Sequence, residues 1–283
     1  MKRILMALLV TGAVVAPSTG LVFADLPPPV DPVQETVNPS FGGGEIALQT
    51  VIGGVIDDLN GGGSASVQND QALRSLVFGC PVGTCPGTII IEQAGNAPAN
   101  AMGIYDLSDA GANPDRVVLF DGSKVAGNTQ SFLFDGDGSV VLDNNNDGIK
   151  NAGDVDTNVF FGSGTNFGVF IETEPGAVIP GGIFFSQDSR NIDLRRHVLF
   201  YHTETGGVSS NGIPILDHSY LFAFEDLPQG SSFEDFDYND FVYNFRFQTN
   251  IPPPPNVPEP GTMVLFGLGS LGAAFVRRRK SQA

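Results

Sequence analysis

The apolar and polar positions of the chain follow two patterns, and the change between them lies near Gly61. Before it, six apolar residues recur at steps of three and four, which is the spacing of one helix face. Gly53 and Gly54 interrupt this spacing, so the sequence predicts one short helix. The six residues are Leu48, Val51, Ile52, Val55, Ile56 and Leu59.

After Gly61 the pattern changes to short apolar and aromatic runs, such as RVVLF, FGVFI and HVLFY, separated by glycine, asparagine, aspartate and proline. Short runs with closely spaced turn residues are typical of an all-β sandwich or barrel. This part of the sequence contains no long amphipathic helix and no repeat period. We therefore predict an all-β fold, a β-sandwich of jelly-roll-like type that carries the short N-terminal helix.

Two proline-rich segments bracket this body and indicate extended linkers. A single sandwich with decorations is favoured over two small domains. A C-terminal helix follows the second linker in this prediction. The predicted organisation is a signal peptide (1–24), a linker (25–40), an N-terminal part with the helix and a cysteine pair (41–100), the sandwich domain (101–249), a second linker (250–257) and a sorting segment (258–283).

The N-terminal segment has the three parts of a secretory signal peptide. Lys2 and Arg3 precede the apolar run ILMALLVTGAVVA, and a small-residue site ends at Ala24. We predict cleavage between Ala24 and Asp25. The alternatives are an earlier cut after Ala16 and a retained anchor, although the run is short for a span of about 20 residues.

The C-terminal segment begins with the triplet Pro258, Glu259 and Pro260, continues with an apolar run and ends in a basic cluster at 277–280. The run is glycine-rich and short, so it predicts a weak anchor that is held only transiently in the membrane. The order of parts resembles the PEP-CTERM sorting signal of Gram-negative bacteria. That resemblance implies processing by an exosortase, a membrane-embedded cysteine protease. A retained single-span anchor is the alternative.

The charge of the chain restricts its partners. Removing two basic residues with the leader and four with the tail leaves eight basic residues against 31 acidic ones, a formal charge of −23. Such a body repels nucleic acid and anionic lipid, and its self-repulsion lowers stability unless counter-ions bind. The 22 phenylalanines argue against disorder. A solvated acidic surface and specific divalent-cation sites are the two interpretations.

The cysteine pair lies in the segment GCPVGTCPG. Cys80 and Cys85 belong to a chain that is predicted to enter an oxidising compartment, so we predict a local structural disulfide. Metal ligation by two thiols alone is the poorer explanation, because zinc prefers four ligands.

The first acidic motif, DNNNDGIKNAGD, has the ligand spacing of an EF-hand calcium loop, with glycine at its sixth position. A hard cation needs six to eight oxygens, and the glycine permits the sharp turn. The loop resembles those of dockerins, but its flanks predict strands instead of helices. An asparagine-rich turn is the alternative. The predicted calcium ligands are Asp143, Asn145, Asp147, the Ile149 carbonyl, Asn151 and Asp154.

The second acidic motif is FEDFDYNDFVYN, with its approach YLFAFEDL. Aromatic side chains alternate on both sides of the acids, so two strands are predicted to pair as a hairpin whose ends hold the carboxylates. Arg246 is the only basic residue nearby in sequence, and a bound cation would neutralise the acids so that the aromatics can pack. An exposed acidic loop is the alternative. The candidate ligands are Glu225, Asp226, Asp237, Asn239 and Asp240.

The segments FEDL and DYND, with weaker upstream pieces, resemble the DUF4114 family of domains of unknown function, over roughly residues 101–247. The resemblance implies a β-rich domain with suspected calcium binding and no established activity. We therefore expect an exported, exosortase-processed, calcium-binding protein that is not an enzyme, on the outer surface or in the matrix of a Gram-negative bacterium. Exopolysaccharide or matrix components are the candidate partners. The alternatives are a calcium-dependent carbohydrate-binding module and, less favoured because the chain lacks tryptophan, a glycosidase.

Overall fold

The computed structural model describes most of the body of the chain. The predicted leader, with its cleavage site at Ala24 and Asp25, lies outside the described residues. So does the sorting segment, with Pro258, Glu259, Pro260 and the predicted C-terminal helix. The described residues are 28, 30–38, 45–73, 77–80, 85–92, 99–173, 182–230, 235–246 and 248–250.

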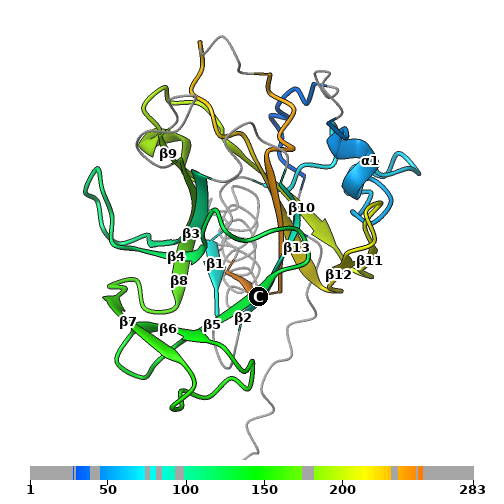
Figure 1. The fold of residues 1–283 in the computed structure, drawn as a ribbon. Coiled ribbons are helices and arrows are strands. Elements are labelled where there is room, and N and C mark those ends of the chain that lie inside the picture. Colours follow the sequence, from blue (N-terminus) through cyan, green and yellow to red (C-terminus); the bar gives the residue numbers. More distant parts are fainter. Residues whose placement is uncertain are drawn as a thin grey trace, which may run out of the picture.

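Two antiparallel sheets form the body (Figure 1). One has the order β15-β1-β8-β3-β4, with β9 paired to β8, and the other has the order β10-β13-β14-β2-β5-β6-β7. The first sheet consists of β1 (Val77–Gly79), β3 (Asn100–Asp106), β4 (Arg116–Phe120), β8 (Asn166–Thr173), β9 (Ile183–Phe185) and β15 (Gln248–Asn250). The second consists of β2 (Cys85–Glu92), β5 (Thr129–Phe134), β6 (Ser139–Asp143), β7 (Val155–Phe160), β10 (Val198–Thr203), β13 (Ser219–Phe224) and β14 (Phe241–Phe245). A small ribbon of β11 (Gly207–Val208) and β12 (Pro214–Ile215) and a 3-10 turn (Asp188–Arg190) lie outside these two sheets.

Aromatic rings fill the space between the two sheets. Phe78 of β1 lies 5.1 Å from Phe222 of β13 and 5.2 Å from Phe200 of β10, measured between ring centroids. Both contacts are edge-to-face, an arrangement that aromatic pairs favour. The alternating residues Tyr243 and Phe245 of β14 join the same buried cluster. The prediction of an all-β sandwich is confirmed.

A second apolar cluster covers the outer face of β13 and β14. Leu221 and Val242, which alternate with the inward-facing aromatics, pack with the buried residues of α1 (Leu48–Ile52). Figure 1 shows α1 on the side of β10 and β13 that faces away from the other sheet. These strands are therefore buried on both faces.

The predicted short helix is present, and it ends where the sequence breaks its spacing. Gly53 forms the C-cap and donates its N–H to the Gln49 carbonyl. The apolar pattern continues beyond the helix in turns, where Ile56 is still buried and Leu59 packs against the core. Burial of the apolar face thus extends further than the helix itself.

A disulfide joins Cys80 to Cys85, with 6.0 Å between the Cα atoms. Cys80 directly follows β1 of one sheet and Cys85 begins β2 of the other, so the bond links the two sheets where the chain passes from one to the other. Within the part of the chain described here, no helix is long and apolar enough to cross a membrane.

Candidate metal centre

The pairing of β13 with β14 places two acids side by side at one end of the hairpin. The register pairs Phe224 with Phe241, so Glu225 and Asp240 are the next residue on each strand. Asp226 lies beside them. One carboxylate oxygen from each of the three acids lies within 4.8 Å of the others. The predicted convergence of acids at the hairpin ends is therefore present for these three residues.

The Glu225 carboxylate is buried without a compensating partner. The residue is 1% exposed, and its Oε2 atom has no hydrogen-bond partner. No ion pair between described residues involves Glu225 or Asp240. Arg246, the nearest basic residue in sequence, pairs with Asp217 instead. A buried charged oxygen without a partner is costly, so this arrangement favours a bound cation.

The same geometry raises the proton affinity of these acids. Burial raises the pKa of Glu225 well above its ordinary value, and the Asp240 carboxylate raises it further. Burial also raises the pKa of Asp240, with repulsion from Asp226 as the next cause. Without a counter-charge these acids hold their protons more tightly than free carboxylates do, because two close carboxylates resist ionising together.

Hydrogen bonds from the opposite sheet fix Asp226. The side-chain amide of Asn100, at the start of β3, donates to Asp226 Oδ2 over 2.7 Å. Thr173, at the end of β8, donates its hydroxyl to the side-chain oxygen Oδ1 of Asn100 over 2.9 Å. The Asp226 N–H donates to Asp240 Oδ2 over 2.9 Å. The centre thus lies where the ends of both sheets meet, and these bonds hold two of its three acids in place.

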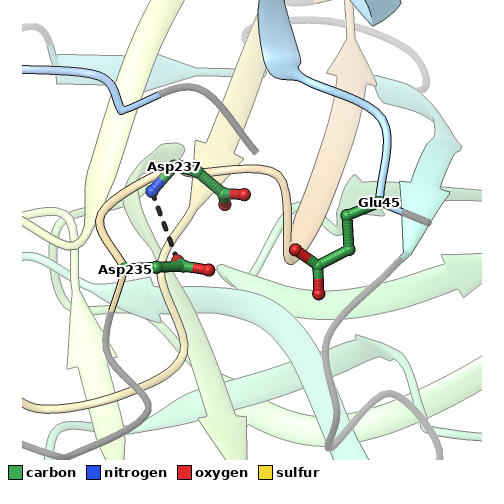
Figure 2. Close-up of side chains that lie close together, drawn as sticks. All are labelled: Glu45, Asp235 and Asp237. Atoms are coloured by element: carbon green, nitrogen blue, oxygen red, sulfur yellow. Dashed lines mark hydrogen bonds between the residues drawn. The ribbon is translucent and has the colours of Figure 1, made fainter. Parts of the chain in front are cut away.

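A second acidic cluster lies in the same hairpin loop. Figure 2 shows Glu45, Asp235 and Asp237 directing their carboxylates toward one another, with Glu45 coming from the segment before α1. Burial raises the pKa of Asp237 to about 7. Asn239 donates its side-chain amide to Asp237 Oδ2 and to the Ile46 carbonyl. These bonds join the loop to the N-terminal segment.

The loop between the strands has an unusual backbone. Phe236 and Tyr238 both have positive φ, 55° and 56°, a conformation that bulky residues rarely adopt. These two residues alternate with Asp235, Asp237 and Asn239 along the chain. The Tyr238 hydroxyl is anchored on the Arg196 carbonyl at 3.0 Å. Strained residues of this kind persist where the surrounding structure holds them, often at ligand sites.

The other predicted calcium loop lies between β6 and β7, as its flanking sequences predict. Both Asp143 carboxylate oxygens accept backbone N–H groups, from Asp147 and Gly148, and both Asp154 oxygens accept N–H groups from Asn144 and Asn151. The loop is thus held by its own side chains. The remaining predicted ligands belong to the same hydrogen-bond network. The side-chain amide of Asn145 donates to Asp147, and that of Asn151 donates to Asp147 and to the Ile149 carbonyl.

The structure divides the predicted hairpin ligands into two groups. Glu225, Asp226 and Asp240 form one cluster, whereas Asp237 belongs to the other. Asn239 braces Asp237. Sequence reasoning missed Glu45, which lies far away along the chain and in no motif. The only sequence signal was the unexplained excess of acidic residues.

The fold and the site define a class: an all-β sandwich with a strongly acidic body and a buried carboxylate cluster at one end. Comparison with protein families finds a match for two segments of the chain. Residues 141–248 match DUF4114, a domain of unknown function, and residues 256–280 match the PEP-CTERM protein-sorting motif. The motif implies sorting by exosortase and export through the envelope of a Gram-negative bacterium. Neither a curated protein nor a solved structure is similar enough to the chain to count as a match.

Proposed function

We propose that this exported protein binds calcium at the cluster of Glu225, Asp226 and Asp240, and that the ion stabilises the sandwich. The observation that carries the proposal is the Glu225 carboxylate, which is 1% exposed and has an oxygen without a hydrogen-bond partner. An ion bound to this oxygen and to the other two carboxylates would supply the missing counter-charge. Calcium is therefore the cofactor that the site supports best.

The donor set selects the kind of cation. All three side chains offer hard carboxylate oxygens, and no histidine or cysteine belongs to the cluster. Such oxygens suit calcium and magnesium better than zinc or copper. Calcium tolerates irregular coordination, whereas magnesium requires a nearly ideal octahedron and keeps several waters. A cluster whose ligands come from two strand ends and a long loop has irregular geometry, and it therefore suits calcium better than magnesium.

The proposed role is structural or adhesive, at the cell surface or in the extracellular matrix. Phe224 and Phe241, the neighbours of Glu225 and Asp240, are fully buried, so a cation here neutralises acids that adjoin the aromatic core. We do not assign catalysis to these acids, because a polysaccharide chain would have to reach a carboxylate that is 1% exposed at Glu225. Exosortase is the processing partner.

Isothermal titration of calcium into the metal-free protein tests the proposal. Wild type is expected to bind, and Glu225→Gln and Asp240→Asn are expected to abolish or strongly weaken this binding. Asp115→Asn is the matched control, because Asp115 is exposed and lies before β4, outside the cluster. Excess magnesium should not substitute. Equal calcium binding by wild type and Glu225→Gln would show that the cluster is not the site.

The loop from Asp143 to Asp154 remains a predicted second calcium site. Its carboxylates already accept loop N–H groups, but oxygens have further lone pairs with which to bind an ion. Asp147→Ala distinguishes the two sites, because it should remove one binding event from the titration and leave the event at Glu225 unchanged. A titration identical to wild type would remove the loop from the list of sites.

A further inference from the structure

A hollow of about 250 Å³ lies beside the acidic loop, between that loop and the N-terminal segment. Asn38 donates its backbone N–H to the Phe236 carbonyl over 3.0 Å, and its side-chain amide donates to the Asp235 carbonyl. The other wall comes from Arg195 and Arg196, just before β10, and from Gln229. Three segments far apart in sequence therefore build this hollow.

Two arginines line the hollow in a body that has few basic residues. Arg196 is 4% exposed, and its guanidinium contacts Asp31 at 3.4 Å and Gln71 at 3.3 Å. Its Nε atom is buried and has no hydrogen-bond partner. One buried donor of the guanidinium thus remains without a partner in a residue that lines the hollow.

Arg195 is exposed and forms no ion pair among the residues described here. Its Nε donates to the side-chain oxygen of Gln229 over 2.8 Å. Its backbone is fixed, because its N–H donates to Asp193 and its carbonyl accepts from the Asn191 amide. The guanidinium therefore projects from a rigid base in a protein whose excess of carboxylates would otherwise pair with it.

The remaining walls combine an aromatic surface with polar groups. Phe236 is half-buried and Tyr238 is buried, and both line the hollow through the strained part of the loop. Glu35 lies on the same lining, and a carboxylate can accept hydrogen bonds from hydroxyl groups. Binding sites for small polar ligands are built in this way, with an apolar wall and a few convergent polar groups.

We propose that this hollow binds an acidic sugar residue, a uronate, with its carboxylate on the exposed guanidinium of Arg195. Guanidinium groups recognise carboxylates through charge-assisted hydrogen bonds, which are stronger than neutral ones. The ring hydroxyls meet Glu35 and Gln229, and the apolar ring face packs on Phe236. A simple anion such as acetate can pair with the guanidinium but lacks the hydroxyl and ring contacts.

Titration of a methyl glucuronoside, followed by NMR chemical shifts in calcium-containing buffer, tests this proposal. Methyl glucoside and acetate serve as matched ligands that lack the carboxylate or the ring. Wild type should bind the glucuronoside at least tenfold more tightly than either, since the bonds of one charged group are worth about that much or more. Arg195→Gln should lose this preference. Arg195 is exposed, so its replacement should leave the fold intact, and a thermal melt of the variant checks this.

Arg246→Gln is the control, because Arg246 is also exposed but pairs with Asp217 away from the hollow. Equal affinity for glucuronoside and glucoside, equal affinity for acetate, or an unchanged preference in Arg195→Gln would each overturn the proposal. The inference goes beyond calcium binding and does not require it. Calcium binding is measured separately by calorimetry, so a failure at the hollow and a failure at the acidic cluster are distinguishable.

Discussion

Replacing Glu225 with glutamine should change the stability of the protein in opposite directions with and without calcium. Glutamine keeps the shape of the side chain and removes its charge. In the metal-free protein it removes a buried carboxylate that has no partner on one oxygen and lies beside Asp226 and Asp240. The variant should therefore be more stable than wild type in chelator. In calcium it should be less stable, because the ion loses a charged ligand.

The size of the effect in chelator follows from the burial of the Glu225 carboxylate, and the size of the effect in calcium follows from the binding free energy of the ion. An unsatisfied buried polar group costs about 1–3 kcal/mol, more when it is charged, so the variant should gain at least the lower part of that range in chelator. Calcium at roughly ten times its Kd stabilises wild type by about 1.4 kcal/mol. For a body of about 200 residues this raises the Tm by about 3–6 °C. The variant should show little of this rise.

The pH dependence of stability in chelator supplies a further test, because the direction of the change with pH can be predicted. Because burial raises the pKa of Glu225, the folded state holds its proton more tightly than the unfolded state does. The resulting stability is fully present below the ordinary pKa of 4.5 and is lost as pH rises through the raised value. The gap between Glu225→Gln and wild type should therefore grow with pH. Asp237, whose pKa is raised to about 7, adds a loss between about pH 4 and 7 to both proteins alike.

Thermal melts of wild type, Glu225→Gln and the control Asp115→Asn are the assay, each in chelator, calcium and magnesium at matched ionic strength and at two pH values. The reasoning is refuted if Glu225→Gln differs from wild type with the same sign in calcium and in chelator. Identical wild-type melts in calcium and in sodium would also refute it. In either case the acids would form a charged cluster without an ion.

Three other predictions concern the core, the disulfide and the processing of the chain. Phe78→Ala should lower the free energy of unfolding by about 3–5 kcal/mol in chemical denaturation, because Phe78 lies among rings of both sheets; a loss below 1 kcal/mol would show that the site collapses around the gap. Replacing Cys80 and Cys85 with serine should cost about 2 kcal/mol, the loop-closure value for so short a loop, and an unchanged denaturation midpoint would contradict this. Mass spectrometry of the exported protein should find Asp25 at the N-terminus and no peptide from 277–280, and detection of that peptide would count against exosortase processing.

Much of the fold follows from patterns that lie close together in sequence. The alternation around Tyr220–Phe224 and Phe241–Phe245 predicted a hairpin, and the structure pairs these strands in the expected antiparallel way. Glycine interrupted the helical spacing after Ile52, and α1 ends there. Periodicity decides such features because each depends on neighbours a few residues away.

The site itself was predictable only in part. Paired strands bring Glu225 and Asp240 together, and the pattern of the hairpin contains that information. Glu45 and Asn100 contact the loop from segments that are distant in sequence, so no rule based on residue spacing could have included them. Arg246 was near in sequence, but its guanidinium pairs with Asp217. The basic residue nearest in sequence therefore does not supply the counter-charge of the acids, and the prediction of a bound cation does not depend on it.

The position of β2 limits how the domain can be divided into independently folding parts. The DUF4114 match covers residues 141–248, yet β2 (Cys85–Glu92) lies between β14 and β5 in the middle of the seven-stranded sheet. A fragment that begins at residue 141 would cut β6, lose β2 and leave an unpaired edge on β14, the strand that carries Asp240 at its end. Open edges of this kind promote aggregation. The segment that is recognisable by similarity is therefore smaller than the unit that folds, and any transplant of this domain into another protein must carry its N-terminal strands with it.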